Sequence, residues 1–292
     1  MSRFSRREFL VRSSAAAVAA GVGVRYAPAW AKEVPPIKVS AGTDVVTLGK
    51  SGIKTTVLGI GTGTVGGSEQ RNMGQESFSR LVQEAYDRGL RYIDTADAYR
   101  THQMVAEAIK PLPRGELFIQ TKTRAKQPEA AKADIERFRK ELGVETLDTV
   151  LMHCMTRKGW VADMRPVIDV LLDAKRKGHT RAIGVSCHGF DPLVDSVDCQ
   201  ELDVHLVRIN HTGQKMDGAP EDVAANIRKI YQQGRGVIGM KIYGEGAFKS
   251  RDDRLASLKY VLGLGAVHCF TIGFSSAQQI DETLELIKEA TG

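Results

Sequence analysis

The sequence predicts an α/β protein, a (β/α)8 TIM barrel with an N-terminal β-hairpin. Short apolar segments typical of buried parallel strands alternate with amphipathic segments of helical period. This alternation repeats eight times between residues 45 and 292. Because right-handed parallel crossovers repeated eight times close on themselves, a barrel is the simplest fold with this order of elements.

Eight short apolar segments are the expected strands. In chain order they are TVLGIG, RYIDT, LFIQTK, TVLMH, TRAIGVS, DVHLVRI, GVIGMKI and VHCFTIG. Helical patterns lie between them, and in PEAAKADIERFRKELG the residues Pro128 and Gly143 stand where helices commonly begin and end. Before the first strand, VVTLGKSGIKTTVLG predicts a hairpin with the turn GKSG, which we expect to plug the bottom of the barrel.

Residues 1–31 have the features of an export leader. Arg6 and Arg7 precede an apolar run, and Ala29 and Ala31 form a small-x-small cleavage site. The arginine pair predicts a twin-arginine signal peptide that the Tat export machinery carries, folded, to the periplasm. A membrane anchor is the alternative, but the apolar run is only about half of the roughly 20 residues needed to span a bilayer. We therefore expect no stable membrane anchor, a linker at residues 32–44 and a barrel domain at residues 45–292.

Composition excludes several other classes of protein. Hydrophobic residues make up 42% of the chain, which is ordinary for a folded globular domain. Of 41 basic and 35 acidic residues, five and one respectively lie in the leader, so the remainder is nearly neutral and no nucleic-acid partner is expected. The four cysteines are widely spaced without a CxxC motif, which gives little support to structural zinc or a redox dithiol.

A dinucleotide-binding Rossmann domain is a competing interpretation. Gly61, Gly63 and Gly66 follow a strand with the spacing of its glycine fingerprint, and Asp94 ends the next strand. That fingerprint requires a helix to open at the third glycine, whereas GSEQRNMGQE intervenes before any helical period. The barrel is therefore preferred, with these glycines allowing backbone to approach a ligand.

Ionisable side chains stand at the carboxyl ends of three consecutive predicted strands. Asp94 ends the second strand, with Asp97 and Tyr99 close behind, while Lys122 and His153 end the third and fourth. In a barrel these ends meet at one mouth, so we expect Asp94, Tyr99, Lys122 and His153 to form a catalytic set. The lysine would lower the pKa of the phenol, the acid would hold the lysine, and the imidazole would orient a carbonyl oxygen. No side chain donates hydride, so a nicotinamide cofactor is expected.

From about Val45 onward, the chain resembles the aldo-keto reductase family. The motifs that carry the resemblance are TLGKSGIKTTVLGIGT, IDTADAY, TKT, LGVETLDTVLMH and TRAIGVS. The resemblance implies reduction of a small aldehyde or ketone by NADPH. It places the proton donor at Tyr99, its supporting pair at Asp94 and Lys122, and the orienting histidine at His153. Asp97 receives no family role and is expected to be a loop cap or polar wall.

The cofactor positions depart from the family pattern. Ser-Cys replaces the usual Ser-Asn after the fifth strand, and TIGFSSAQQIDET lacks the basic residues that normally hold the adenosine 2′-phosphate. NADH is therefore the alternative to NADPH. The expected cofactor-binding residues are Gly61, Thr62, Ser186, Arg208, Met240, Lys241, Ser275 and Ser276.

Three further interpretations concern side chains at the same end of the predicted barrel. The pairs His153-Cys154 and Cys187-His188 contain zinc-type ligands, but consecutive strand residues face opposite ways, so no metal site is predicted. A Cys154–Cys187 disulfide has no supporting spacing. Trp160 fits a pocket wall and helix packing equally well.

Two functions stay open at this level. The first is an exported carbonyl reductase, which in the periplasm would need a tightly held cofactor or an electron partner. The second is a reductase-like barrel that binds a ligand or partner without hydride transfer.

Overall fold

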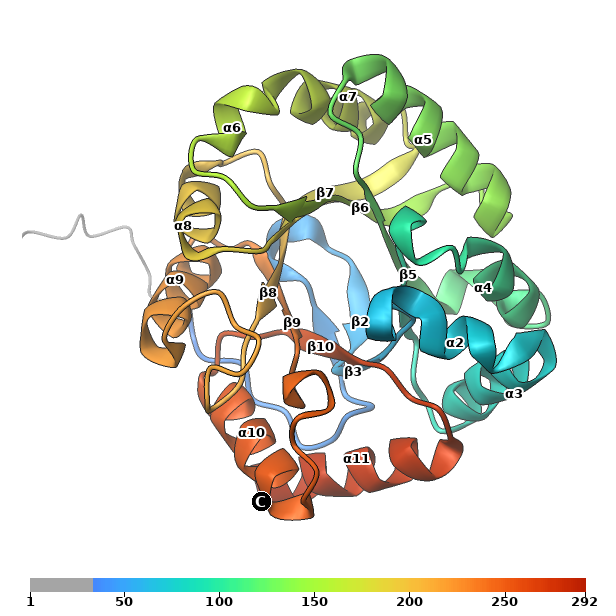
Figure 1. The fold of residues 1–292 in the computed structure, drawn as a ribbon, viewed down its shortest axis with the longest axis vertical. Coiled ribbons are helices and arrows are strands. Elements are labelled where there is room, and N and C mark those ends of the chain that lie inside the picture. Colours follow the sequence, from blue (N-terminus) through green and yellow to red (C-terminus); the bar gives the residue numbers. More distant parts are fainter. Residues whose placement is uncertain (1–33) are drawn as a thin grey trace, which may run out of the picture. The chain divides into compact units, whose positions relative to one another are not determined.

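A computed structural model describes residues 34–292, and the predicted signal peptide lies outside these residues. Eight parallel strands close into a barrel in the order β10-β3-β4-β5-β6-β7-β8-β9, surrounded by helices (Figure 1). The predicted barrel is confirmed, and the Rossmann alternative is excluded because the sheet is closed. Within residues 34–292, no helix is long and apolar enough to cross a membrane.

The strands and helices alternate along the chain as predicted. The barrel strands are β3 (Leu58–Gly61), β4 (Tyr92–Asp94), β5 (Phe118–Thr123), β6 (Leu147–Met155), β7 (Thr180–Cys187), β8 (Val204–Arg208), β9 (Gly236–Met240) and β10 (Cys269–Ile272). The helices are α2 (Ser68–Asn72), α3 (Gly74–Asp87), α4 (His102–Ile109), α5 (Pro128–Leu142), α6 (Trp160–Asp163), α7 (Arg165–Arg176), α8 (Phe190–Asp198), α9 (Pro220–Gln232), α10 (Arg251–Gly263) and α11 (Ala277–Thr291).

The predicted hairpin closes one end of the barrel. Strands β1 (Val45–Thr47) and β2 (Lys54–Thr56) pair antiparallel on either side of the turn. Leu48 and Ile53, beside the turn, are fully buried in one cluster with inward-facing side chains of seven barrel strands. The hairpin therefore fills the amino end of the barrel with apolar side chains, and the carboxyl end is left for polar ones.

The helices pack against the barrel strands through their apolar faces. In α5 the buried side chains Ala131, Ile135, Phe138 and Leu142 recur at helical spacing and face the strands. Pro128 begins this helix, and Gly143 ends it with φ 66°, a left-handed conformation that suits glycine. The expected boundaries of α5 are confirmed.

One segment differs from its expected structure. The stretch after Gly66 was expected to delay any helix, but α2 forms at Ser68–Asn72 after a 3-10 turn, η2 (Thr64–Gly67). Left-handed glycines at Gly66 and Gly67 reverse the chain and allow this short helix to begin. The four cysteines are free thiols, so the Cys154–Cys187 disulfide is not formed.

Candidate active site

The four predicted catalytic side chains come together at the carboxyl end of the barrel. Asp94 is the last residue of β4, Lys122 lies in β5 and His153 in β6, and these strands are neighbours. Tyr99 lies in a 3-10 turn, η3 (Asp97–Tyr99), directly after β4. All four are therefore supplied by one sector of the barrel mouth.

Lys122 lies at the centre of this group. Its ammonium donates to both carboxylate oxygens of Asp94, at 2.7 and 2.8 Å, and to the carbonyl of Thr95 at 2.9 Å. The same Nζ is 3.5 Å from Tyr99 Oη. Burial is the largest single effect on Lys122 and opposes its charge, but attraction by Asp94 and Tyr99 and hydrogen bonds to both together outweigh it and raise the lysine pKa. The lysine is therefore a fixed cation beside the phenol.

Burial raises the pKa of Tyr99, and although Lys122 and Arg124 act in the opposite direction, the net shift is upward. Lys122 thus has the lowering effect expected from the sequence, but desolvation of the phenolate is the larger effect. The phenol accordingly holds its proton at neutral pH, as a general acid must before it reacts.

His153 is a neutral hydrogen-bonding group beside Tyr99. The two rings lie edge to face with centroids 5.5 Å apart. Burial, reinforced by the positive charges of Lys122 and Arg124, lowers the pKa of His153 to about 2. Its Nδ1 is buried with no partner among residues 34–292. The imidazole therefore stays uncharged and offers a polar edge to the site.

A β-bulge sets the position of His153. The pairing of β6 with β7 shifts between Met152 and Met155, and Cys154 has φ 66°. The Cys154 backbone N–H donates to Ser186 Oγ at 2.9 Å. Bulges commonly redirect a side chain at an active site. Ser186, expected to contact cofactor, therefore supports the bulge next to His153.

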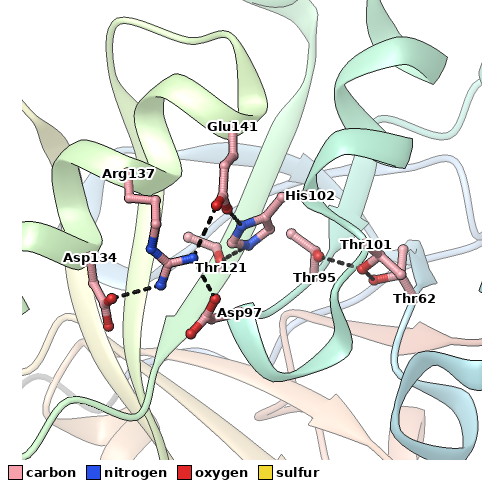
Figure 2. A network of polar contacts seen from close by, with 9 residues as sticks. All are labelled: Thr62, Thr95, Asp97, Thr101, His102, Thr121, Asp134, Arg137 and Glu141. Carbon is pink, nitrogen blue, oxygen red and sulfur yellow. Dashed lines mark hydrogen bonds and ion pairs between the residues drawn. The ribbon is translucent and has the colours of Figure 1, made fainter.

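The turn that carries Tyr99 is anchored on two sides. Arg71 of α2 donates to the Tyr99 carbonyl and, at 3.2 Å, to that of Gly66. On the other side, Arg137 of α5 donates to Asp97 at 2.7 Å (Figure 2). Asp97, predicted to be a cap or polar wall, is thus an ion-pair anchor between η3 and α5.

The same network holds the one candidate group of metal ligands within residues 34–292. Ligand atoms of Asp97, His102 and Glu141 lie within 4.8 Å of one another. However, the Arg137 guanidinium binds both Asp97 and Glu141, and both ring nitrogens of His102 are bonded, to Glu141 and Thr121 (Figure 2). The carboxylates are therefore already neutralised by a cation of the chain itself.

A cavity of about 480 Å³ opens beside Tyr99 and extends toward the loops after β9 and β10. Among the predicted cofactor residues, Gly61, Met240 and Lys241 line it. Thr271 Oγ1 in its wall is buried with no partner in the described chain. An unpaired polar atom in the wall of a cavity this size fits a cofactor with polar groups.

The other predicted cofactor residues lie outside the cavity wall, and each has a partner within the protein. Thr62 bonds Thr101 at 2.8 Å (Figure 2), and Arg208 bonds Asp217 at 3.1 Å and His188. Ser276 caps α11, and Ser275 donates to Gln279. Hydrogen bonding within the protein therefore accounts for Thr62, Ser186, Arg208, Ser275 and Ser276.

The sequence did not single out the aromatic and basic side chains of the cavity. Tyr243, Phe248, Lys249 and Arg254 all line it, from the segment between β9 and the first turn of α10. Tyr243 follows the last residue of β9 by three positions, after the chain turns at Lys241, which has φ 63°. Trp160 contributes nothing to the cavity wall, since it is buried and its Nε1 donates to the Pro192 carbonyl at 3.0 Å.

Gly63 controls the position of Tyr99 and provides a test of the site geometry. A Cβ at Gly63 would lie 2.5 Å from Tyr99 Cζ and 3.0 Å from Oη. We expect Gly63→Ala to displace the phenol and lower kcat at least tenfold, because catalytic groups tolerate little misplacement. Gly115→Ala is the control, since its Cβ would meet nothing within 4 Å. Steady-state kinetics and melting curves of both variants would check this, and an unchanged kcat in Gly63→Ala would refute the contact.

The sequence of the chain matches a family model and several known proteins. Residues 57–260 match the model of the aldo/keto reductase family. An NADH-specific methylglyoxal reductase of Escherichia coli is 23% identical over 184 residues, 54% of this chain and 56% of that protein. A glycerol 2-dehydrogenase (NADP(+)) of Saccharomyces cerevisiae is 28% identical over 146 residues, 47% of this chain and 45% of that protein. The chain thus spans about half the length of the curated relatives it matches.

Solved structures of aldo-keto reductases have the same fold as this chain. An aldo-keto reductase from Bacillus halodurans, in its holo form, superposes with a TM-score of 0.68 at 16% identity, over 85% of this chain and 95% of that one. The predicted family resemblance is confirmed, because the family model spans the barrel from its first strand into α10. The chain belongs to the aldo/keto reductase family.

Proposed function

We propose that this protein reduces the carbonyl group of an aldehyde or ketone with a nicotinamide cofactor. The observation that carries the proposal is the buried chain of contacts from Asp94 through Lys122 to Tyr99, next to a neutral His153. The bound cofactor supplies the hydride for the carbonyl carbon. Tyr99 donates the proton to the carbonyl oxygen, and the product is the alcohol.

Each of the other three side chains has a role in this proton transfer. As Tyr99 loses its proton, the ammonium of Lys122 stabilises the phenolate, and Asp94 keeps that ammonium charged and in place. His153 offers a hydrogen bond that orients the carbonyl oxygen beside Tyr99. A neutral imidazole suits this task because it does not compete with Tyr99 as the acid.

The cavity beside Tyr99 supports cofactor binding. Gly61, Met240 and Lys241 would hold the part of the cofactor nearest Tyr99, and Thr271 offers an unpaired hydroxyl. Lys249 adds positive charge to the wall, and phosphate groups would bind there, whereas the nearby Arg254 is paired with Glu282 at 2.9 Å. Relatives use NADH in one case and NADP(+) in another, so both cofactors belong in the test.

The direct test is turnover by the purified full chain. Aldehydes and ketones would be supplied with NADPH or NADH in parallel, and oxidation of the cofactor and formation of the alcohol would both be measured. We expect stoichiometric alcohol formation with at least one cofactor. No cofactor binding in a calorimetric titration and no turnover would refute the proposal and favour a non-catalytic, ligand-binding barrel.

We also propose that the chain is exported to the periplasm by the Tat machinery. The motif at Arg6 and Arg7, followed by an apolar run and a small-x-small site, supports this. Replacement of both arginines by lysine should retain the protein in the cytoplasm, whereas the same change at Arg3 and Arg12 should not. Cell fractionation would check this, and normal export of the Arg6→Lys/Arg7→Lys variant would overturn it. After export, turnover would depend on retained cofactor or an electron partner.

A further inference from the structure

The positive charges around the candidate site are not equally neutralised. Four basic side chains act on the imidazole of His188 at the end of β7: Arg208, Lys241, Arg124 and Lys122. Three of them have a carboxylate partner, in the pairs Lys122–Asp94 at 2.7 Å, Arg208–Asp217 at 3.1 Å and Lys241–Glu245 at 2.7 Å. Arg124 forms no ion pair or side-chain hydrogen bond with any residue in the 34–292 range. Of these four cations, Arg124 is therefore the one without a carboxylate partner in the described chain.

The backbone places Arg124 on the side of the barrel mouth. Lys122 points inward to Asp94, whereas the next residue, Thr123, bonds Asp134 of the surrounding helix α5 at 2.5 Å. Successive side chains of an extended chain point to opposite faces. Arg124, the first residue after β5, is therefore expected on the same face as Lys122. Arg124 is exposed, so its long side chain is accessible to a solute that enters the mouth.

The electrostatic influence of Arg124 agrees with this placement. Burial is the largest cause of the pKa shifts of Tyr99, His153 and His188, and Arg124 is a further cause that lowers the pKa of all three. This shared influence agrees with a position of Arg124 on the same side of the barrel mouth as the three rings.

Arg208 and His188, which are also near the site, are less available to an anion than Arg124. Arg208 has no acceptor function, so His188 Nδ1, which receives its hydrogen bond, must be unprotonated. Burial and Arg208 lower the pKa of His188 to about 4, and the ring is neutral at physiological pH. Among the four cations around His188, Arg124 is thus the one that retains its full hydrogen-bonding capacity for a ligand within the described residues.

We propose that the substrate is an oxo acid, whose carboxylate binds the guanidinium of Arg124 while its carbonyl oxygen lies between Tyr99 and His153. This inference rests on the proposed carbonyl reduction. Arginine binds carboxylates through two parallel N–H groups, so it both attracts such a substrate and orients it. Arg124 is a specificity-determining residue in this scheme, and the proton is still donated by Tyr99.

The test compares an oxo acid with its own methyl ester, which removes the charge and keeps the carbonyl. Glyoxylate and succinic semialdehyde, each with its ester, would be supplied to the full chain with the cofactor that supports turnover. We expect the wild type to prefer the acid in kcat/KM, and Arg124→Gln to lower the acid-to-ester ratio about tenfold or more, mainly through KM. Arg124→Lys should restore part of the ratio.

Lys126→Gln is the matched control, because Lys126 is an exposed cation two residues farther along the same loop. It should leave the acid-to-ester ratio unchanged. An equal ratio in wild type and Arg124→Gln, or the same loss in Lys126→Gln, would overturn the inference while carbonyl reduction itself stands.

A binding measurement separates this inference from the proposed function. If no carbonyl compound is turned over, the proposed reduction fails, and calorimetric titration with the hydroxy acids glycolate and 4-hydroxybutyrate, in the presence of cofactor, tests Arg124 alone. Binding that Arg124→Gln weakens and Lys126→Gln does not would support the carboxylate site. Absence of binding, or binding that is equal in all three proteins, would overturn it.

Discussion

Replacement of Tyr99 by Phe is expected to lower kcat for carbonyl reduction by about a hundredfold to ten-thousandfold, the range for loss of a general acid. The hydroxyl is the group that donates the proton, and the aromatic ring that packs against His153 and Gly63 is kept. Stability should change little, because the hydroxyl has one protein partner in the described chain, Lys122 at 3.5 Å. Single-turnover kinetics and thermal unfolding of the variant would measure both effects.

Tyr86→Phe supplies the matched control. It makes the same chemical change at a phenol that bonds Glu116 at 2.6 Å on the outside of the barrel. It should keep full activity. If Tyr99→Phe also turned over at the wild-type rate, Tyr99 would not be the proton donor, and another acid or water would have to replace it in the proposed reaction.

Replacement of Lys122 by Met is expected to cost about 3–5 kcal/mol in the free energy of unfolding, as well as activity. Lys122 and Asp94 are both buried, and the lysine supplies two of the hydrogen bonds to that carboxylate. Without the ammonium, Asp94 would keep a buried charge with Gln120 as its remaining side-chain partner. Denaturant unfolding followed by circular dichroism would measure the loss.

The double variant Asp94→Asn/Lys122→Met distinguishes a lost charge partner from lost packing. Removing both charges should recover much of the stability, since no unpaired carboxylate is left in the barrel, but it should not recover turnover. A double variant as unstable as Lys122→Met would show that the lysine stem, and not the ion pair, carries the stability.

Much of the barrel could be predicted because local patterns specify its parts. The spacing of Ala131, Ile135, Phe138 and Leu142 already defines the buried face of α5, and the eightfold alternation restricts the topology. The failure at α2 has a local cause. Left-handed glycines start a short helix there, and a five-residue helix is too short to show an apolar period.

The candidate site was predictable in part for a geometric reason. In a parallel barrel all strands end at one mouth, so residues at the ends of β4, β5 and β6 must meet, and Asp94, Lys122 and His153 do so. The contacts of Thr62, Ser186 and Arg208 could not be predicted in this way. Their partners are Thr101, Cys154 and His188. These contacts depend on side-chain direction and on a β-bulge, and neither of these two features can be inferred from the order of residues.

The barrel, the hairpin plug and the strand ends that carry Asp94, Lys122 and His153 can therefore be inferred from the order of residues, because hydrophobic period and chain direction are local properties. The charge state of the site, in contrast, depends on how the chain folds. Burial raises the pKa of Tyr99 against the effect of Lys122, and ion pairing neutralises Lys122, Arg208 and Lys241 but not Arg124 within residues 34–292. Desolvation and charge pairing depend on distances between residues far apart in the chain, so they arise only once the chain has folded.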